Sequence, residues 1–264
     1  MPAVQLERLR TEINDLAWKF TRPAEFLQDL HDLLGFYANR VFRAAPSAKT
    51  GTAITVYHVP GLIMRQLDAS LASLCQENPD AAMVLMDALW KDAILEPRLV
   101  AISMLSHLPL NPADKVLEKL QAWCRPEEDA QVLAALFDQG SVNFRRSYPE
   151  RWIELVRSWL DAGPLPSKVM GLRALLPVVQ DREFANLPPV FSMVGPLLQS
   201  PPAPLLNDLQ AVLEALSKRS PKETAYFLRQ ALNTTQSSAM TRLIRRVMGS
   251  FDEETQSGLR NLLK

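Results

Sequence analysis

Apolar residues recur at three- and four-residue steps along most of the chain, and this spacing places them on one side of an α-helix. Clear examples are Leu67, Leu71 and Leu74, Val132, Ala135 and Leu136, and Leu209, Val212, Leu213 and Leu216. The alternation typical of a half-buried strand is found only at residues 52–59, which are too few to suggest more than an extended connection. The pattern therefore predicts an all-α protein.

Prolines mark the starts of the predicted helices at regular intervals. Pro79, Pro112, Pro149, Pro188 and Pro221 are separated by 33, 37, 39 and 33 residues. Proline is favoured at the first position of a helix, and an asparagine or serine that can cap the helix precedes three of the five. Each interval has room for two helices and a turn, for example residues 112–123 followed by 127–138.

Two antiparallel helices repeated with this period are typical of HEAT, armadillo and TPR solenoids. The Trp, Gly, Tyr and Pro pattern of TPR repeats is not met, which favours HEAT-like pairs. We therefore predict a right-handed, armadillo-like α-solenoid of about six HEAT-like antiparallel helix pairs. It would form a single domain over residues 1–264, with N-terminal capping helices in residues 1–52 and repeats in residues 53–264.

Within the first 52 residues, two helices are expected, around residues 4–20 and 23–42. The polar, glycine-containing segment at residues 45–52 is the best internal boundary in the chain. Further along, residues 220–223 and 250–253 both have the S-x-x-E pattern of a capping box. The acidic run at residues 127–129 would open a helix where the macrodipole favours negative charge, with a catalytic carboxylate cluster as the alternative.

The composition limits the classes of protein. The chain has 264 residues, 47% of them apolar, which is enough to build a core and argues against disorder. Nine glycines against 20 prolines disfavour Gly-rich phosphate loops. The 29 Lys/Arg balance the 29 Asp/Glu, which argues against a histone-like polyanion binder. The signs are nevertheless separated, because residues 1–139 carry −5 and residues 140–264 carry +5, so the C-terminal half is the better anion-facing candidate.

Signals for secretion, membrane insertion, metal binding and nucleophilic catalysis are missing from the sequence. Cys75 and Cys124 fit neither a disulfide framework nor a zinc spacing, and both lie in apolar stretches where burial is expected. His31, His58 and His107 are far apart and belong to no recognised motif. We expect a cytoplasmic protein with reduced thiols and with no metal, cofactor or membrane partner.

Tryptophans are the aromatic residues most relevant to nucleic-acid binding. Trp152 and Trp159 are seven residues apart, which places them on one face of a predicted helix. They could stack on a nucleobase. Their apolar neighbours favour core packing instead, and Trp90 and Trp123 are interpreted in the same way.

Basic residues of the C-terminal half are the strongest candidates for a binding surface. In a solenoid, equivalent turns and inner helices line up, so cations of successive repeats would form a stripe that faces phosphates. A solvated charged surface without a ligand is the alternative. The candidate nucleic-acid-binding residues are Arg145, Arg146, Lys168, Arg173, Lys218, Arg219, Arg242, Arg245 and Arg246.

Three segments carry recognisable motifs: residues 57–65 (YHVPGLIMR), 85–105 (LMDALWKDAILEPRLVAISML) and 209–228 (LQAVLEALSKRSPKETAYFL). The second segment contains an LW…E-x-R-x-x-A pattern made by Leu89, Trp90, Glu96, Arg98 and Ala101. The third has Lys218 and Pro221 in the places expected for a penultimate helix pair. Together the segments resemble the AlkD-like DNA alkylation repair proteins, which are HEAT-like solenoids, over roughly residues 57–248.

This resemblance implies a monofunctional glycosylase that releases cationic N-alkylated bases without flipping them out. In active members, tryptophans and an aspartate lie at the concave face beside the sugar of the lesion. The carboxylate stabilises an oxocarbenium-like sugar, and the indoles contact the cationic nucleoside. Here, alignment on residues 148–150 puts Ala134 or Ala135 where the aspartate belongs, and residues 126–140 contain no tryptophan.

Other family positions also differ. The family's later tryptophan is matched here by Ala211 or Val212, and the family's arginine only loosely by Lys168 or Arg173.

We therefore predict a non-catalytic binding module that holds a nucleic-acid backbone, such as duplex DNA, or a protein on its concave face. The alternative is a divergent DNA glycosylase that uses Asp138, one turn beyond Ala134, to excise N-alkylated purines. A purely protein-binding scaffold with an apolar inner groove is the third possibility.

Overall fold

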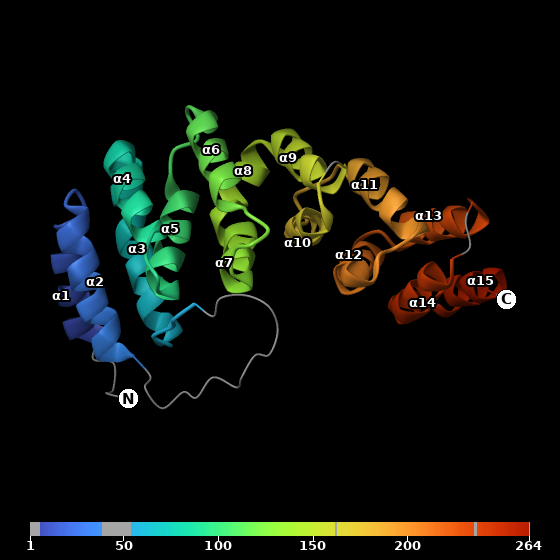
Figure 1. Ribbon diagram of the computed structural model, residues 1–264, viewed down its shortest axis with the longest axis horizontal. Coiled ribbons are helices and arrows are strands. Elements are labelled where there is room, and N and C mark those ends of the chain that lie inside the picture. The colour runs from blue at the N-terminus through green and yellow to red at the C-terminus, as the bar shows by residue number, and fades with distance from the viewer. Residues whose placement is uncertain (1–5, 39–53, 162, 235–236, 264) are drawn as a thin grey trace. The chain divides into compact units, whose positions relative to one another are not determined.

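The computed structural model describes residues 6–38, 54–161, 163–234 and 237–263 (Figure 1). Within these residues, fifteen α-helices are joined by short turns. The only β pairing there is one isolated parallel bridge, between Thr55 and Ile94. The predicted all-α class is confirmed, and residues 54–60 form a non-helical connection as expected.

Contacts divide the chain into two compact units, residues 1–144 and 145–264. A short helix, α8 (Val142–Ser147), spans the division. Each unit is a stack of antiparallel helices, which confirms the predicted helix-pair repeat. That residues 1–264 act as one domain stays a prediction.

The first unit has two layers. α1, α3, α5 and α7 pack side by side in one layer, and α2 and α4 pack on them in the other. Ion pairs of Lys115 with Asp80 and of Lys119 with Asp87 attach α6 beside α4. A five-residue π-helix, η1 (Leu136–Gly140), continues α7. The helices are α1 (Leu6–Ala17), α2 (Pro23–Tyr37), α3 (Gly61–Glu77), α4 (Pro79–Trp90), α5 (Leu95–His107), α6 (Ala113–Trp123) and α7 (Ala130–Ala135).

The second unit follows the same plan. α9, α11, α13 and α15 form one layer, and α10, α12 and α14 form the other. Two short 3₁₀ segments, η2 (Ala203–Leu205) and η3 (Met248–Ser250), lie at turns. The helices are α9 (Pro149–Asp161), α10 (Leu165–Gln180), α11 (Pro188–Gln199), α12 (Leu206–Arg219), α13 (Pro221–Thr234), α14 (Ser238–Val247) and α15 (Glu253–Leu262).

Side chains at the predicted three- and four-residue spacing fill the space between the layers, and Leu67, Leu71, Leu209 and Leu213 are all buried. α10 packs tightly against α9 at Gly171. A Cβ at this position would lie 2.7 and 2.8 Å from two side-chain carbons of Leu160 on α9, so the packing there depends on the absence of a side chain.

Glu96, from the LW…E-x-R-x-x-A pattern, ties the connection before α3 to the helical stack. Its carboxylate is 4% exposed and accepts hydrogen bonds from the backbone N–H groups of Tyr57 (3.0 Å) and His58 (2.8 Å). His58 has a φ of 55°, a left-handed conformation that is uncommon for a residue other than glycine. The buried carboxylate therefore stabilises a strained backbone, and its role is structural.

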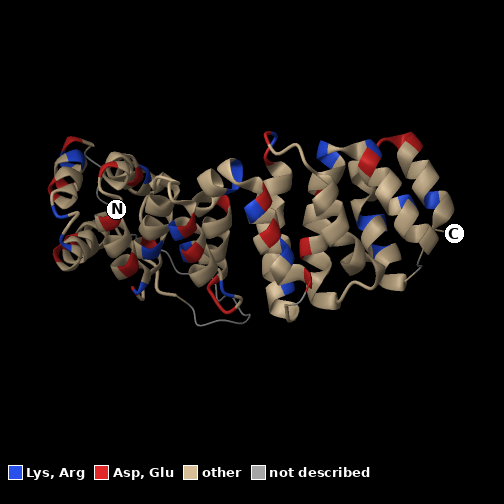
Figure 2. Ribbon diagram, turned by 90° about the horizontal axis from the view of Figure 1, so that it is seen from above, with Lys and Arg blue, Asp and Glu red and all other residues tan. Residues whose placement is uncertain are grey.

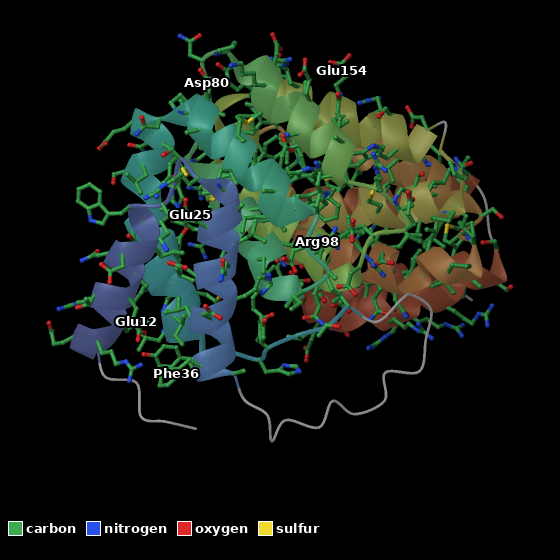
Figure 3. All side chains as sticks on the ribbon, turned by 60° about the vertical axis from the view of Figure 1, so that its left-hand side comes forward. Glu12, Glu25, Phe36, Asp80, Arg98 and Glu154 are labelled. Carbon is green, nitrogen blue, oxygen red and sulfur yellow. The ribbon has the colours of Figure 1, made fainter. Side chains whose placement is uncertain are left out.

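Arg98, from the same pattern and labelled in Figure 3, contacts a pair of stacked tryptophans within the first unit. Its guanidinium is 4.3 Å from the ring centroid of Trp90, which stacks in turn on Trp123 at 4.3 Å and 6°. One guanidinium nitrogen also lies 2.7 Å from the carboxylate of Glu128. These contacts join α4, α5, α6 and the turn before α7.

Several predicted boundaries need correction. The first two helices are shorter than expected, ending at Ala17 and Tyr37, and the predicted segment at residues 45–52 lies outside the described residues. Residues 125–129 form a turn instead of opening a helix, because Glu128 pairs with Arg98 and Asp129 caps α7 through its side chain. α15 is capped by Asp252 and not by Ser250. The capping contact between Ser220 and Glu223 is confirmed, and α13 begins at Pro221.

Candidate nucleic-acid interface

One layer of the second unit carries seven of that unit's fourteen helical cations and few acids, and the charged residues can be followed in Figure 2. α10, α12 and α14 carry seven Lys/Arg against two Asp/Glu, a net charge of +5. α9, α11, α13 and α15 carry five against six, a net charge of −1. The seven cations are Lys168, Arg173, Lys218, Arg219, Arg242, Arg245 and Arg246, and all belong to the set proposed from the sequence. We call α10, α12 and α14 the basic layer.

The densest group of cations is on α14. This helix buries Leu243, Ile244 and Val247 against the unit and exposes Arg242, Arg245 and Arg246 on its other side. The three apolar residues share one face of the helix, and the arginines fall on the other face. Burial of the apolar face therefore leaves the guanidinium groups in solvent. Like Lys168 on α10 and Lys218 on α12, these arginines form no ion pair with a described residue.

Arg173 and Arg219 are held by the protein itself. The Nε of Arg173 lies 3.0 Å from the carboxylate of Asp208 and so pairs α10 with α12. Arg219 donates hydrogen bonds to four backbone carbonyl oxygens at the end of α10 and in the turn that follows. The acceptors are Val179 (3.3 Å), Asp181, Arg182 (3.2 Å) and Phe184. These carbonyls have no acceptor role inside the helix, so Arg219 acts as a cap for α10.

Arg145 and Arg146 lie on α8 and not in the basic layer. The Nε of Arg146 is 2.8 Å from the carboxylate of Asp181 and 3.5 Å from that of Glu183. The hydrogen bond from Arg146 lowers the pKa of Asp181, and the same contact raises the pKa of Arg146. The side chain of Arg145 is half-buried. Arg146 therefore has a role within the second unit.

Trp90, Trp123, Trp152 and Trp159 pack against other side chains of the protein, as predicted, whereas Trp18 is 83% exposed. Trp152 is fully buried and meets Trp159 in an edge-to-face arrangement with ring centroids 6.2 Å apart. Trp90 and Trp123 form the stack described above. Core packing thus accounts for all four rings, and base stacking is not needed to explain them.

Asp138, the low-priority catalytic candidate, is exposed on the π-helix η1. Ala134, one of the two residues that the sequence alignment sets against the family's aspartate, is also exposed, on α7. Both residues are in the first unit, whereas Trp152 and Trp159 are in the second.

Two histidines have acidic partners that the sequence did not reveal. His31 on α2 lies 2.8 Å from the carboxylate of Asp92 and 3.0 Å from the hydroxyl of Tyr57. The Nε2 of His107 on α5 is 2.7 Å from the carboxylate of Asp68, which also accepts a hydrogen bond from a serine hydroxyl on α5. The partners are 61 and 39 residues away in the chain, so only the register of the repeats brings them together.

A search of the described residues finds no group of three or more His, Cys, Asp or Glu that could hold a metal ion. No helix among those residues is long and apolar enough to cross a membrane. Cys75 and Cys124 are free thiols and are buried, as predicted. Burial, with a smaller contribution from Asp68, raises the pKa of Cys75 to about 12, and burial raises the pKa of Cys124.

A pocket of about 530 Å³ opens on the second unit, between the start of α9, the end of α10 and the turn before α11. Apolar side chains including Trp152, Ile153, Val178 and Phe184 line it, together with arginines and carboxylates. No local sequence pattern predicts this pocket, because its lining residues come from separate parts of two helix pairs.

Comparison with known proteins decides the family. A family model described as DNA alkylation repair enzyme matches residues 53–247, well over half of the chain. The chain belongs to this family. The resemblance drawn from residues 57–248 is thereby confirmed at the level of the DNA alkylation repair family. No curated protein matches the chain.

Among solved structures, this chain is similar to computationally designed armadillo repeat proteins for modular peptide recognition. The identity is 12%, and the match covers 94% of this chain and 100% of the designed one, with a TM-score of 0.28.

Proposed function

We propose that this DNA alkylation repair family member is a non-catalytic binding module that holds the backbone of duplex DNA on its basic layer. The supporting observation is the net charge of +5 on α10, α12 and α14, against −1 on the other layer of the same unit. Lys and Arg contacts with phosphates supply affinity that does not depend on sequence.

Five of the seven cations are available for this role. Lys168, Lys218, Arg242, Arg245 and Arg246 form no ion pair with a described residue, whereas Arg173 and Arg219 already have acceptors in the protein. Each phosphate contact contributes about 0.9 to the slope of log K against log salt. Five contacts would therefore give a slope of about −4 to −5.

The absence of catalysis in this proposal rests on the position of Ala134. A methyl group cannot stabilise the positive charge that develops on a sugar during base release, whereas a carboxylate can. The module would then retain the family's scaffold and its affinity for a backbone while leaving the glycosidic bond intact.

Fluorescence anisotropy with a labelled DNA duplex, repeated over a salt series, tests the binding. The variant Arg242→Glu/Arg245→Glu/Arg246→Glu should weaken binding about equally for unrelated sequences and reduce the salt slope by about 3. The matched control is Lys222→Glu/Arg229→Glu/Arg260→Glu. It makes the same change in net charge at three exposed residues of α13 and α15, in the other layer. Equal losses in the two variants would contradict the basic layer as the interface, and salt-independent or undetectable binding would contradict DNA as the partner.

A divergent glycosylase is the second candidate, and one observation favours it. Asp138 is exposed on a π-helical turn, a geometry that is frequent at functional sites. Incubation with DNA that contains N7- or N3-alkylated purines tests this candidate by release of free base. Release that is abolished in Asp138→Asn would replace the non-catalytic proposal, and absence of release would support it.

A further inference from the structure

We propose that the pocket on α9 is a binding site for an organic cation with a flat apolar body, such as an aryl-alkylammonium group or an arginine beside an aromatic side chain. The proposal is independent of DNA binding, because the pocket lies outside the basic layer except for the last turn of α10.

The floor of the pocket is apolar. Trp152 and Ile153 come from α9, Val178 from the end of α10 and Phe184 from the following turn, with Pro149 and Pro189 at the two helix starts. A volume of about 530 Å³ is within the range of pockets that enclose a small ligand. Trp152, Ile153 and Val178 are already buried, so an aromatic or branched body would cover mainly the partly exposed Phe184, Pro149 and Pro189. Removing this apolar surface from water is the main source of affinity at such sites.

Some of the charged side chains around the pocket form ion pairs with one another. Arg146 pairs with Asp181, whose side chain is only 10% exposed, and more weakly with Glu183. Arg145 also has an interaction within the protein. A ligand would therefore not need to replace these pairs, and they keep the turn before α11 in place against α8.

The charges that remain are predominantly negative. Glu150 and Glu154 are exposed, lie one turn apart on α9 and form no ion pair with a described residue (Figure 3 labels Glu154). Glu183 is 73% exposed and makes only the 3.5 Å contact with Arg146. Arg157 is the one lining cation among the described residues that forms no ion pair. Two unpaired carboxylates and the weakly paired Glu183, against the unpaired Arg157, favour a cationic ligand over an anion.

The same charges disfavour nucleic acid at this site. A phosphate that entered the pocket would approach Glu150, Glu154 and Glu183, and repulsion from these groups would offset its attraction to Arg157. The second unit thus presents a positive layer and, at the start of α9, a negatively rimmed apolar pocket. The two surfaces have opposite ligand preferences.

The test uses the full chain and two probes, tryptamine and the capped dipeptide acetyl-tryptophanyl-arginine amide, followed by ¹H–¹⁵N NMR. Saturable shifts are expected for the indole N–H of Trp152 and the amides of Ala185 and Asn186, which line the pocket. Ligands of this size should bind with a Kd of about 1 mM. Binding of tryptamine alone would assign a free small molecule as the natural source of the cation. Binding of the dipeptide alone would assign a peptide.

Indole-3-acetate has the same ring with the opposite charge and should bind at least about threefold more weakly than tryptamine. Glu150→Gln/Glu154→Gln should raise the Kd for the cations by about threefold to tenfold. The control Glu253→Gln/Glu254→Gln makes the same change in net charge at two exposed acids in the first turn of α15, and should leave the Kd unchanged.

Ala185→Trp keeps every charge and places a ring at the pocket, so it should abolish binding of both probes. The proposal is overturned if neither cation gives a saturable shift up to about 20 mM. It is also overturned if indole-3-acetate binds as well as tryptamine, or if binding survives both Ala185→Trp and Glu150→Gln/Glu154→Gln.

Discussion

Arg98→Ala should destabilise the first unit, because it removes a guanidinium that contacts both the Glu128 carboxylate and the Trp90 ring. The side chains of Arg98 and Glu128 are only 13% and 17% exposed, and their charged groups are 2.7 Å apart. The guanidinium also lies 4.3 Å from the ring centroid of Trp90. Truncation leaves Glu128 largely buried without its partner and exposes one face of the aromatic stack.

The magnitude follows from these contacts. Removing one partner of a buried ion pair costs about 3 to 5 kcal/mol, and a cation–π contact adds about 1 kcal/mol. Because neither group is fully buried, a total of about 3 to 4 kcal/mol is expected. Arg98→Lys should lose less, since it keeps the charge but not the planar contact with the ring.

Arg8 provides a control with the same chemistry at the surface. It lies 2.7 Å from Glu12 and 4.4 Å from the ring centroid of Phe36, but its side chain is 54% exposed (Figure 3 labels Glu12 and Phe36). Urea unfolding followed by tryptophan fluorescence and far-UV circular dichroism measures both variants. Arg98→Ala should lower the unfolding midpoint clearly, and Arg8→Ala should change it little. Equal shifts would refute the argument that burial makes the Arg98 contacts strong.

Three other predictions concern the remaining buried or paired groups. Glu96→Ala should lower the free energy of unfolding by about 2 to 4 kcal/mol in urea titrations, because two backbone N–H groups lose their acceptor. Glu77 is exposed, and Glu77→Ala should leave the free energy of unfolding nearly unchanged. Arg146 lowers the pKa of Asp181, so their pair stabilises the fold above the unfolded-state pKa and loses its effect as the pH falls through the folded-state pKa. Arg146→Ala should therefore melt below the native chain at pH 7, and the two melting temperatures should converge as the pH falls through the folded-state pKa of Asp181. Because burial raises the pKa of both thiols, Ellman's reagent should react with Cys75 and Cys124 only after unfolding.

Much of the fold could be predicted from the sequence because the signals for it are local. The spacing of leucines and the prolines at helix starts are properties of neighbouring residues, and α4, α9, α11 and α13 begin at Pro79, Pro149, Pro188 and Pro221 as expected. One error arose because a distant residue competed for a local group. Glu128 was expected to interact with its own helix start, but Arg98, 30 residues earlier, pairs with it.

The candidate interface was predictable only in part, for the same reason. Counting cations in the C-terminal half identified the residues that form the basic layer. The sequence could not reveal that Arg219 caps α10 or that Arg173 pairs with Asp208, because these acceptors lie 35 to 40 residues away. The pocket on α9 depends in the same way on how neighbouring helix pairs stack.

The missing side chain of Gly171 has a consequence for the spacing of the cations. Lys168 and Arg173 are on the same helix, three residues before and two after this glycine. A methyl group at residue 171 would meet the Leu160 side chain, and either that side chain or the helix would have to move to accommodate it. The glycine therefore helps to set how far Lys168 and Arg173 stand from α9.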